Sequence, residues 1–73
     1  GVENAHTASF FVSVTDGVMT VNRLSGTSQI AIYLLTGEQV MTVATTETTF
    51  ATTLPQGAYI VNVNGEYAKA VVR

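Results

Sequence analysis

Residues 8–22, ASFFVSVTDGVMTVN, contain two short β-rich runs joined by the dipeptide Asp16-Gly17. In the first run polar and apolar side chains alternate, so that Val12 and Val14 fall on one face of an extended chain. Asp-Gly between two such runs is a strong hairpin signal, because both central residues of a type I′ turn need positive φ. The segment therefore predicts a β-hairpin with one apolar face and one face of serine and threonine.

The rest of the chain continues this pattern of short strands separated by turn residues. Pro55-Gln56-Gly57 and Asn64-Gly65 interrupt the second half, and Asn-Gly again favours a tight hairpin. Further strands are expected at residues 29–36, 39–44, 47–54, 58–64 and 66–73. About seven short strands at a spacing of roughly ten residues predict an all-β fold, an Ig-like antiparallel β-sandwich.

The expected strand at residues 29–36 is apolar on both faces. Ile30, Ile32 and Leu34 can face the core of a two-layer sandwich, but Ala31, Tyr33 and Leu35 then cannot. Exposed apolar strips often mark association surfaces, so a homodimer or docking on another protein is one interpretation. A loop lying over that face is the other, and the sequence leaves both open.

Composition limits the classes of protein to which the chain can belong. Its 73 residues suffice for one domain, and we expect a linker at residues 1–7 and a single domain at 8–73. With only Arg23, Lys69 and Arg73 as cations and a net charge of −2, the chain has no basic stripe, which excludes nucleic acid as a partner. Apolar runs fall far short of the roughly 18 residues of a membrane span, and any export leader is expected in a longer precursor.

No constellation of residues predicts catalysis, and we expect no enzyme activity, metal or cofactor. His6 is the only histidine, it lies in the predicted linker, and cysteine is absent. The five carboxylates lie mostly at turns or strand starts, where acids serve turn geometry and solubility. The six glycines are dispersed among the turns and form no phosphate-binding loop.

Three blocks of sequence share a pattern with a known family. Residues 30–40, IAIYLLTGEQV, are similar to V-x-I-Y-D-x-x-G-R-x-V, and residues 54–63, LPQGAYIVNV, are similar to L-x-x-G-x-Y-I-V-x-V. Residues 69–73, KAVVR, are similar to a K-x-V-V-K/R terminus. In this order the blocks resemble the type IX secretion C-terminal sorting domains, the Por secretion system C-terminal signal domain family. Leu34 stands where that family usually has Asp, and Glu38 stands where Arg or Lys is usual.

The resemblance implies a C-terminal signal that directs a cargo protein through the outer-membrane type IX translocon. The implied partners are the translocon and its shuttle proteins, an N-terminal cargo domain, and a surface sortase-like peptidase that commonly removes the domain and attaches the cargo. The domain would pass through the periplasm to the cell surface or the medium. The residues implied in recognition are Gly57, Tyr59, Ile60, Val61, Lys69, Val71, Val72 and Arg73, with Tyr33 and Gly37 in the family's turn motif.

The two ends of the chain carry two further hypotheses. If Ala68, Ala70 and Val72 pack inward, Lys69 and Arg73 point outward together. They then form a basic patch for the export machinery, or they guard an edge strand against unwanted pairing, and both interpretations stand. Gly1 is a candidate processing site, because a polar linker is accessible to a peptidase, although an arbitrary chain end accounts for it equally.

An Ig-like or fibronectin-like accessory module for binding or adhesion is the alternative function. Carbohydrate platforms rely on exposed aromatic rings, and tryptophan is absent from the chain. Phe10, Phe11 and Phe50 are expected to pack inside the sandwich. A sugar-binding role is therefore the weaker expectation within this class.

Overall fold

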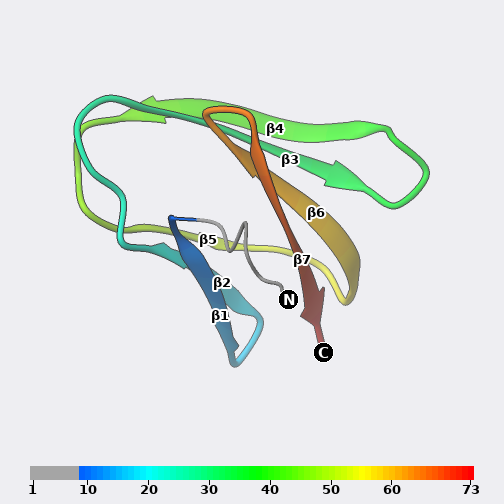
Figure 1. The fold of residues 1–73 in the computed structure, drawn as a ribbon. Coiled ribbons are helices and arrows are strands. Elements are labelled where there is room, and N and C mark those ends of the chain that lie inside the picture. The colour runs from blue at the N-terminus through cyan, green and yellow to red at the C-terminus, as the bar shows by residue number, and fades with distance from the viewer. Residues whose placement is uncertain (1–8) are drawn as a thin grey trace, which may run out of the picture.

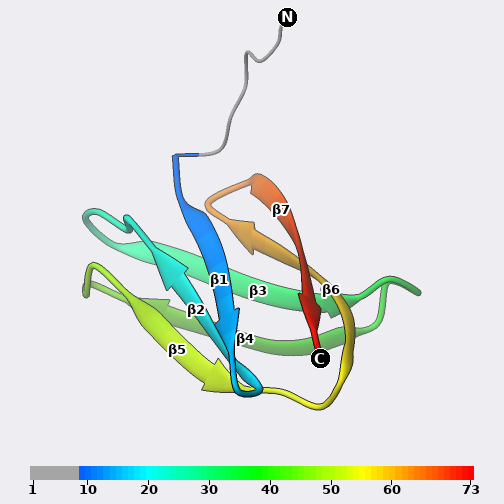
Figure 2. The same cartoon turned by 90° about the horizontal axis from the view of Figure 1, so that it is seen from below.

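The computed structural model describes residues 9–73, which form seven β-strands and no helix. The strands are β1 (Phe11–Thr15), β2 (Val18–Asn22), β3 (Ser28–Leu34), β4 (Gln39–Thr45), β5 (Phe50–Thr53), β6 (Gly57–Val63) and β7 (Glu66–Val72). They build two antiparallel sheets that pack face to face (Figures 1 and 2). The expected all-β sandwich is thus confirmed.

Strand order places distant parts of the sequence side by side. Within residues 9–73 one sheet has the order β1-β2-β5 and the other has the order β4-β3-β6-β7. The chain therefore leaves the larger sheet after β4, adds β5 to the edge of the first hairpin, and returns with β6 beside β3. A chain that passes between the two sheets in this way is typical of Ig-like sandwiches. Strand β4 remains in the larger sheet, where it pairs with β3.

Both predicted hairpin turns have the backbone that their sequences demand. Asp16 and Gly17 have φ of 53° and 78°, and Asn64 and Gly65 have φ of 52° and 92°. Two successive residues at positive φ match the twist of the flanking strands, which is why Asp-Gly and Asn-Gly occur at these points. The β1–β2 and β6–β7 hairpins are therefore determined by local sequence.

The core lies between the sheets and is built from the inward members of each alternating strand. Met19, Val21, Ile30, Ile32 and Val61 are fully buried there. Phe10, just before β1, is also buried, and Val12 and Val14 pack against the cluster from β1. The alternation read from residues 8–22 therefore predicts the correct inward face.

Two expectations about individual segments are wrong. Phe11 is 51% exposed, because its neighbours Phe10 and Val12 take the inward positions, and the Arg23 guanidinium carbon lies 6.0 Å from the centre of its ring. The strand expected at residues 47–54 begins only at Phe50. The chain before it forms a loop in which the Thr48 carbonyl accepts a hydrogen bond from the Leu24 amide.

Candidate functional site

The outer face of the four-stranded sheet brings together residues from all three sequence blocks. Tyr33 on β3 is the cross-strand partner of Ile60 on β6, and Ile60 is the partner of Lys69 on β7. The three residues therefore form one row across the sheet. In an antiparallel sheet, directly opposed residues on one face have Cβ atoms about 4.5–5.5 Å apart. A partner lying along this row would touch all three blocks at once.

Neighbouring rows extend the apolar character of this face. Ala58 pairs with Val71, and Asn62 pairs with Tyr67. Tyr67 is 66% exposed and Val71 is 45% exposed, so β7 presents an apolar side chain on either side of Lys69. The face thus combines large exposed apolar groups with a single ammonium group on its outermost strand.

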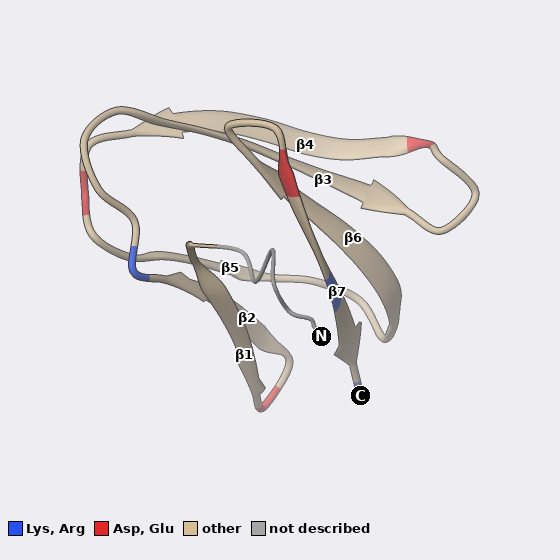
Figure 3. Ribbon diagram, viewed as in Figure 1, with Lys and Arg blue, Asp and Glu red and all other residues tan. Residues whose placement is uncertain are grey.

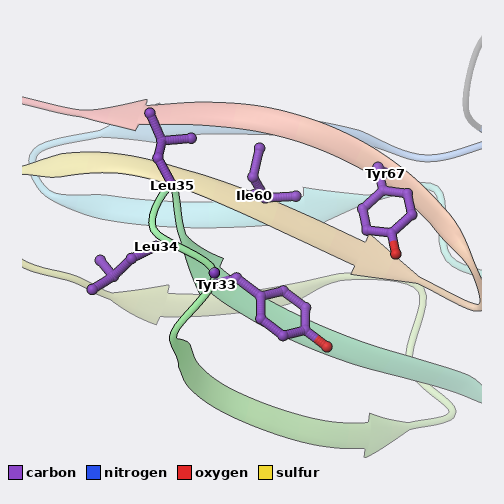
Figure 4. Close-up of a pocket in the computed structure, with 6 residues that line it drawn as sticks. Tyr33, Leu34, Leu35, Ile60 and Tyr67 are labelled. Carbon is purple, nitrogen blue, oxygen red and sulfur yellow. The ribbon is translucent and has the colours of Figure 1, made fainter.

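A shallow groove of about 240 Å³ crosses this face beside the β3–β4 turn. It is lined by Tyr33, Leu34, Leu35, Gly37, Ile60 and Tyr67 (Figure 4). The turn is closed by two backbone hydrogen bonds, from the Leu34 amide to the Glu38 carbonyl and from the Gly37 amide to the Leu34 carbonyl. Gly37 has a φ of 97°, a conformation that favours glycine, so the turn motif shapes one end of the groove.

Part of the apolar surface expected from the third strand is present, just beyond the end of β3. Leu35 is 55% exposed at the end of the groove, whereas Ala31 and Tyr33 are half-buried. Leu35 follows β3 and is open to solvent, whereas the association surface expected for the strand itself stays a prediction. The open groove is consequently the most distinctive feature of the sheet.

The final strand has the two faces that its sequence predicts. Ala70 and Val72 are buried and Ala68 is half-buried, while Lys69 and Arg73 are exposed. Figure 3 colours the cationic residues blue, and a blue segment is visible on β7. The carboxylate of Glu66, at the start of β7, accepts hydrogen bonds from the amide and the hydroxyl of Ser9, at 2.7 Å and 3.1 Å. The first described residue is therefore tied to the end of β7 that is far from Arg73.

Three residues implied in recognition lie inside the sandwich. Tyr59, Val61 and Val72 belong to the core, so in the folded domain they support the outer face and do not contact a partner directly. The Tyr59 hydroxyl donates a hydrogen bond to the Pro55 carbonyl, at 2.7 Å. This arrangement matches the tyrosine corner of Ig-like sandwiches, and Gly57 passes close to the same ring, since an added Cβ would lie 3.7 Å from it.

Leu35 and Tyr67 line the groove although the three-block pattern does not select them. Their position follows from strand pairing, which brings β3, β6 and β7 together. A local signal does exist for Tyr67, because it lies two residues before Lys69 and so shares its face. Leu35 follows the last residue of β3, where strand alternation ends, and its exposure depends on the turn.

The hypotheses about the N-terminal segment, namely the linker at residues 1–7, His6 and processing at Gly1, lie outside the described residues. Within residues 9–73, no group of three or more His, Asp or Glu side chains is placed to hold a metal ion. The same part of the chain contains no helix long and apolar enough to cross a membrane. The chain matches no protein-family model, no curated protein and no solved structure.

Proposed function

We propose that this chain is a C-terminal sorting domain that directs a cargo protein through a type IX secretion translocon. The observation that carries the proposal is the row Tyr33–Ile60–Lys69, in which each of the three resembling blocks contributes one outward side chain. The strand order β3-β6-β7 makes these three residues cross-strand neighbours, and none of the three side chains is fully buried. Their meeting supports a surface that a single partner reads.

In this proposal the groove contributes apolar contacts to recognition, and the two cations of the last strand contribute charged contacts. The groove offers apolar area, with Tyr33 and Tyr67 as aromatic contacts of the kind that dominate binding energy at interfaces. Lys69 and Arg73 supply positive charge on a domain whose net charge is −2, which favours approach of an acidic surface. The partner is thus an outer-membrane translocon or shuttle protein with an apolar ridge flanked by carboxylates.

Ser9 and Arg73 lie at opposite ends of β7, an arrangement that suits a domain that links cargo to machinery. Ser9 is held beside Glu66 at one end of β7, and Arg73 lies at the other end. A cargo domain N-terminal to Ser9 would therefore sit at the end of the face remote from the basic terminus. In this proposal the domain travels through the periplasm to the cell surface, where a sortase-like peptidase cuts ahead of β1.

A reporter fusion tests the proposed function directly. Residues 1–73 are fused to the C-terminus of a fluorescent protein targeted to the periplasm of a bacterium with a working type IX system. We expect the reporter at the cell surface or in the medium, and we expect it to remain periplasmic in a strain lacking the translocon. A reporter that stays periplasmic while the domain is folded would contradict the proposal and favour an accessory binding module.

Removing both cations of the last strand is expected to lower export of that reporter by about tenfold, because two exposed charged contacts, each worth up to roughly 1 kcal/mol, together contribute about 1.4 kcal/mol. The variant is Lys69→Ala with Arg73→Ala, and the measurement is the fraction of reporter outside the cell. Arg23→Ala is the matched control, since Arg23 is also a cation but follows β2 in the other sheet. Normal export of the folded double variant, together with new aggregation, would show that the cations only guard an edge.

A further inference from the structure

The β6–β7 turn contains the only Asn-Gly pair of the chain. Asn64 and Gly65 are both exposed, and both have positive φ. Asparagine deamidates fastest before glycine, because glycine has no side chain to hinder attack by its amide nitrogen on the preceding side-chain carbonyl carbon. The other asparagines of the chain precede alanine, arginine or valine, which hinder this attack. Asn64 is therefore the asparagine with the highest intrinsic reactivity.

The carboxamide of Asn64, the group that would be attacked, is held by strand β3. The β3–β6 pairing ends at Ile30 and Val63, and Gln29 and Asn64 are the next opposed residues. The Asn64 amide donates to the Gln29 carbonyl at 3.0 Å, and the Gln29 amide donates to the side-chain oxygen Oδ1 of Asn64 at 2.8 Å. The side chain of Asn64 thus takes the place that its backbone carbonyl would have in a regular antiparallel ladder.

The attacking group is held by a different partner. The Gly65 amide donates a hydrogen bond to the side-chain oxygen Oδ1 of Asn62, at 3.1 Å. Attack requires this nitrogen to lose its proton and to approach the side-chain carbon Cγ of Asn64. The hydrogen bond to Asn62 must open for that step, and the carboxamide must turn away from Gln29. The folded hairpin therefore restrains both reacting groups, and an opened hairpin restrains neither.

We infer that Asn64 is a site of spontaneous deamidation that the folded domain protects, so that the modification marks chains whose β6–β7 hairpin has opened. In the first step the Gly65 nitrogen forms a bond to Cγ of Asn64, and the side-chain nitrogen leaves as ammonia, taking up the proton of the Gly65 amide. Water then opens the resulting succinimide ring at either carbonyl carbon. The products are aspartate and isoaspartate, each with one added negative charge.

The two products fit the hairpin differently. Aspartate keeps a side-chain oxygen that can accept the hydrogen bond from Gln29, and it tolerates positive φ. Isoaspartate adds a methylene group to the backbone of a two-residue turn, whose length sets the register of β6 against β7. Because this register aligns Ile60 with Lys69, isoaspartate formed in an opened chain hinders return to the native pairing. The inference is independent of the proposed export function.

Incubation of the full chain at mildly alkaline pH, with and without denaturing urea, tests the inference. Peptide mapping by mass spectrometry gives the deamidated fraction at each asparagine over time. We expect Asn64 to react about tenfold faster or more in urea, because reaction in the folded chain requires two hydrogen bonds to open. We also expect Asn64 to be the fastest asparagine in urea. Equal rates at Asn64 in the folded and unfolded chain would overturn the inference, and so would faster reaction at another asparagine in urea.

The variant Asn62→Val tests the restraint on Gly65 without denaturant. Valine suits strand β6 but accepts no hydrogen bond, so deamidation of Asn64 in the folded variant should rise about threefold or more. Asn22→Val is the matched control, because Asn22 lies on β2 of the other sheet, and the rate at Asn64 should stay unchanged. Circular dichroism checks that both variants are folded. An unchanged rate in folded Asn62→Val would contradict the restraint by Asn62, and the urea comparison decides the inference if that variant does not fold.

Discussion

Replacing Tyr59 with alanine is expected to unfold the domain at 25 °C. Tyr59 is 3% exposed and belongs to the core cluster, so truncation removes a whole ring from between the sheets. Substitutions of this type cost about 3–5 kcal/mol. A domain of this size rarely has more than about 3–5 kcal/mol of stability in total. Loss of the β-sheet signal in circular dichroism, and of the cooperative urea transition, would be the measured result.

The conservative variant Tyr59→Phe separates the ring from its hydroxyl. It keeps the packing but leaves the Pro55 carbonyl without its 2.7 Å hydrogen bond, which is expected to cost about 1–2 kcal/mol. The variant should stay folded with a lower urea midpoint and an unchanged slope. The contrary result would be a folded Tyr59→Ala variant whose urea transition has the same midpoint as that of the wild type. The Tyr59 ring and its hydrogen bond would then contribute nothing to stability.

The hairpins and the core could be predicted because their signals are local. Asp16-Gly17 and Asn64-Gly65 specify their turns, and alternation from Val12 to Val14 identifies the inward face. The start of β5 at Phe50 could not be predicted, because the preceding threonine-rich segment has β-branched side chains that suit a strand as well as a loop. In the structure this segment is a loop, and its Thr48 carbonyl accepts a hydrogen bond from the Leu24 amide, which is distant in the sequence.

The candidate site depended on strand order, which local patterns do not encode. The sequence indicates that Tyr33, Ile60 and Lys69 lie on strands, but only the order β4-β3-β6-β7 makes them cross-strand neighbours. The resemblance also groups Tyr59, Ile60 and Val61 as one motif. The pleat separates them, since Tyr59 and Val61 are buried and Ile60 points to the groove. The motif therefore combines a structural role with a surface role.

One buried polar group, the Ser28 hydroxyl, lowers the free energy of unfolding of the sandwich. The Ser28 hydroxyl is buried at the start of β3 and has no hydrogen-bond partner among residues 9–73. An unsatisfied buried hydroxyl typically costs about 1–3 kcal/mol, a large share of the stability of so small a domain. The fold consequently depends strongly on its remaining core contacts, so an export variant must be checked for folding before its export is interpreted.

The double variant Tyr33→Thr with Ile60→Thr is expected to lower export of the fused reporter by about tenfold or more. The two side chains are cross-strand partners and both line the groove, so the change removes apolar contact area from the centre of the proposed recognition surface. Threonine is β-branched and fits a strand, so the fold should be retained. Surface and medium fluorescence, normalised to total reporter, gives the export, and circular dichroism of the purified domain gives the folding.

Phe11→Thr is the matched control for this prediction. Phe11 is 51% exposed on β1 of the other sheet, so the substitution removes an exposed aromatic side chain without touching the groove. Export should be unchanged by Phe11→Thr if the export machinery binds the outer face of the four-stranded sheet. Equal losses in both variants would instead point to general apolar exposure as the determinant. Normal export of the folded Tyr33→Thr, Ile60→Thr variant would exclude the groove and leave the basic terminus as the remaining recognition element.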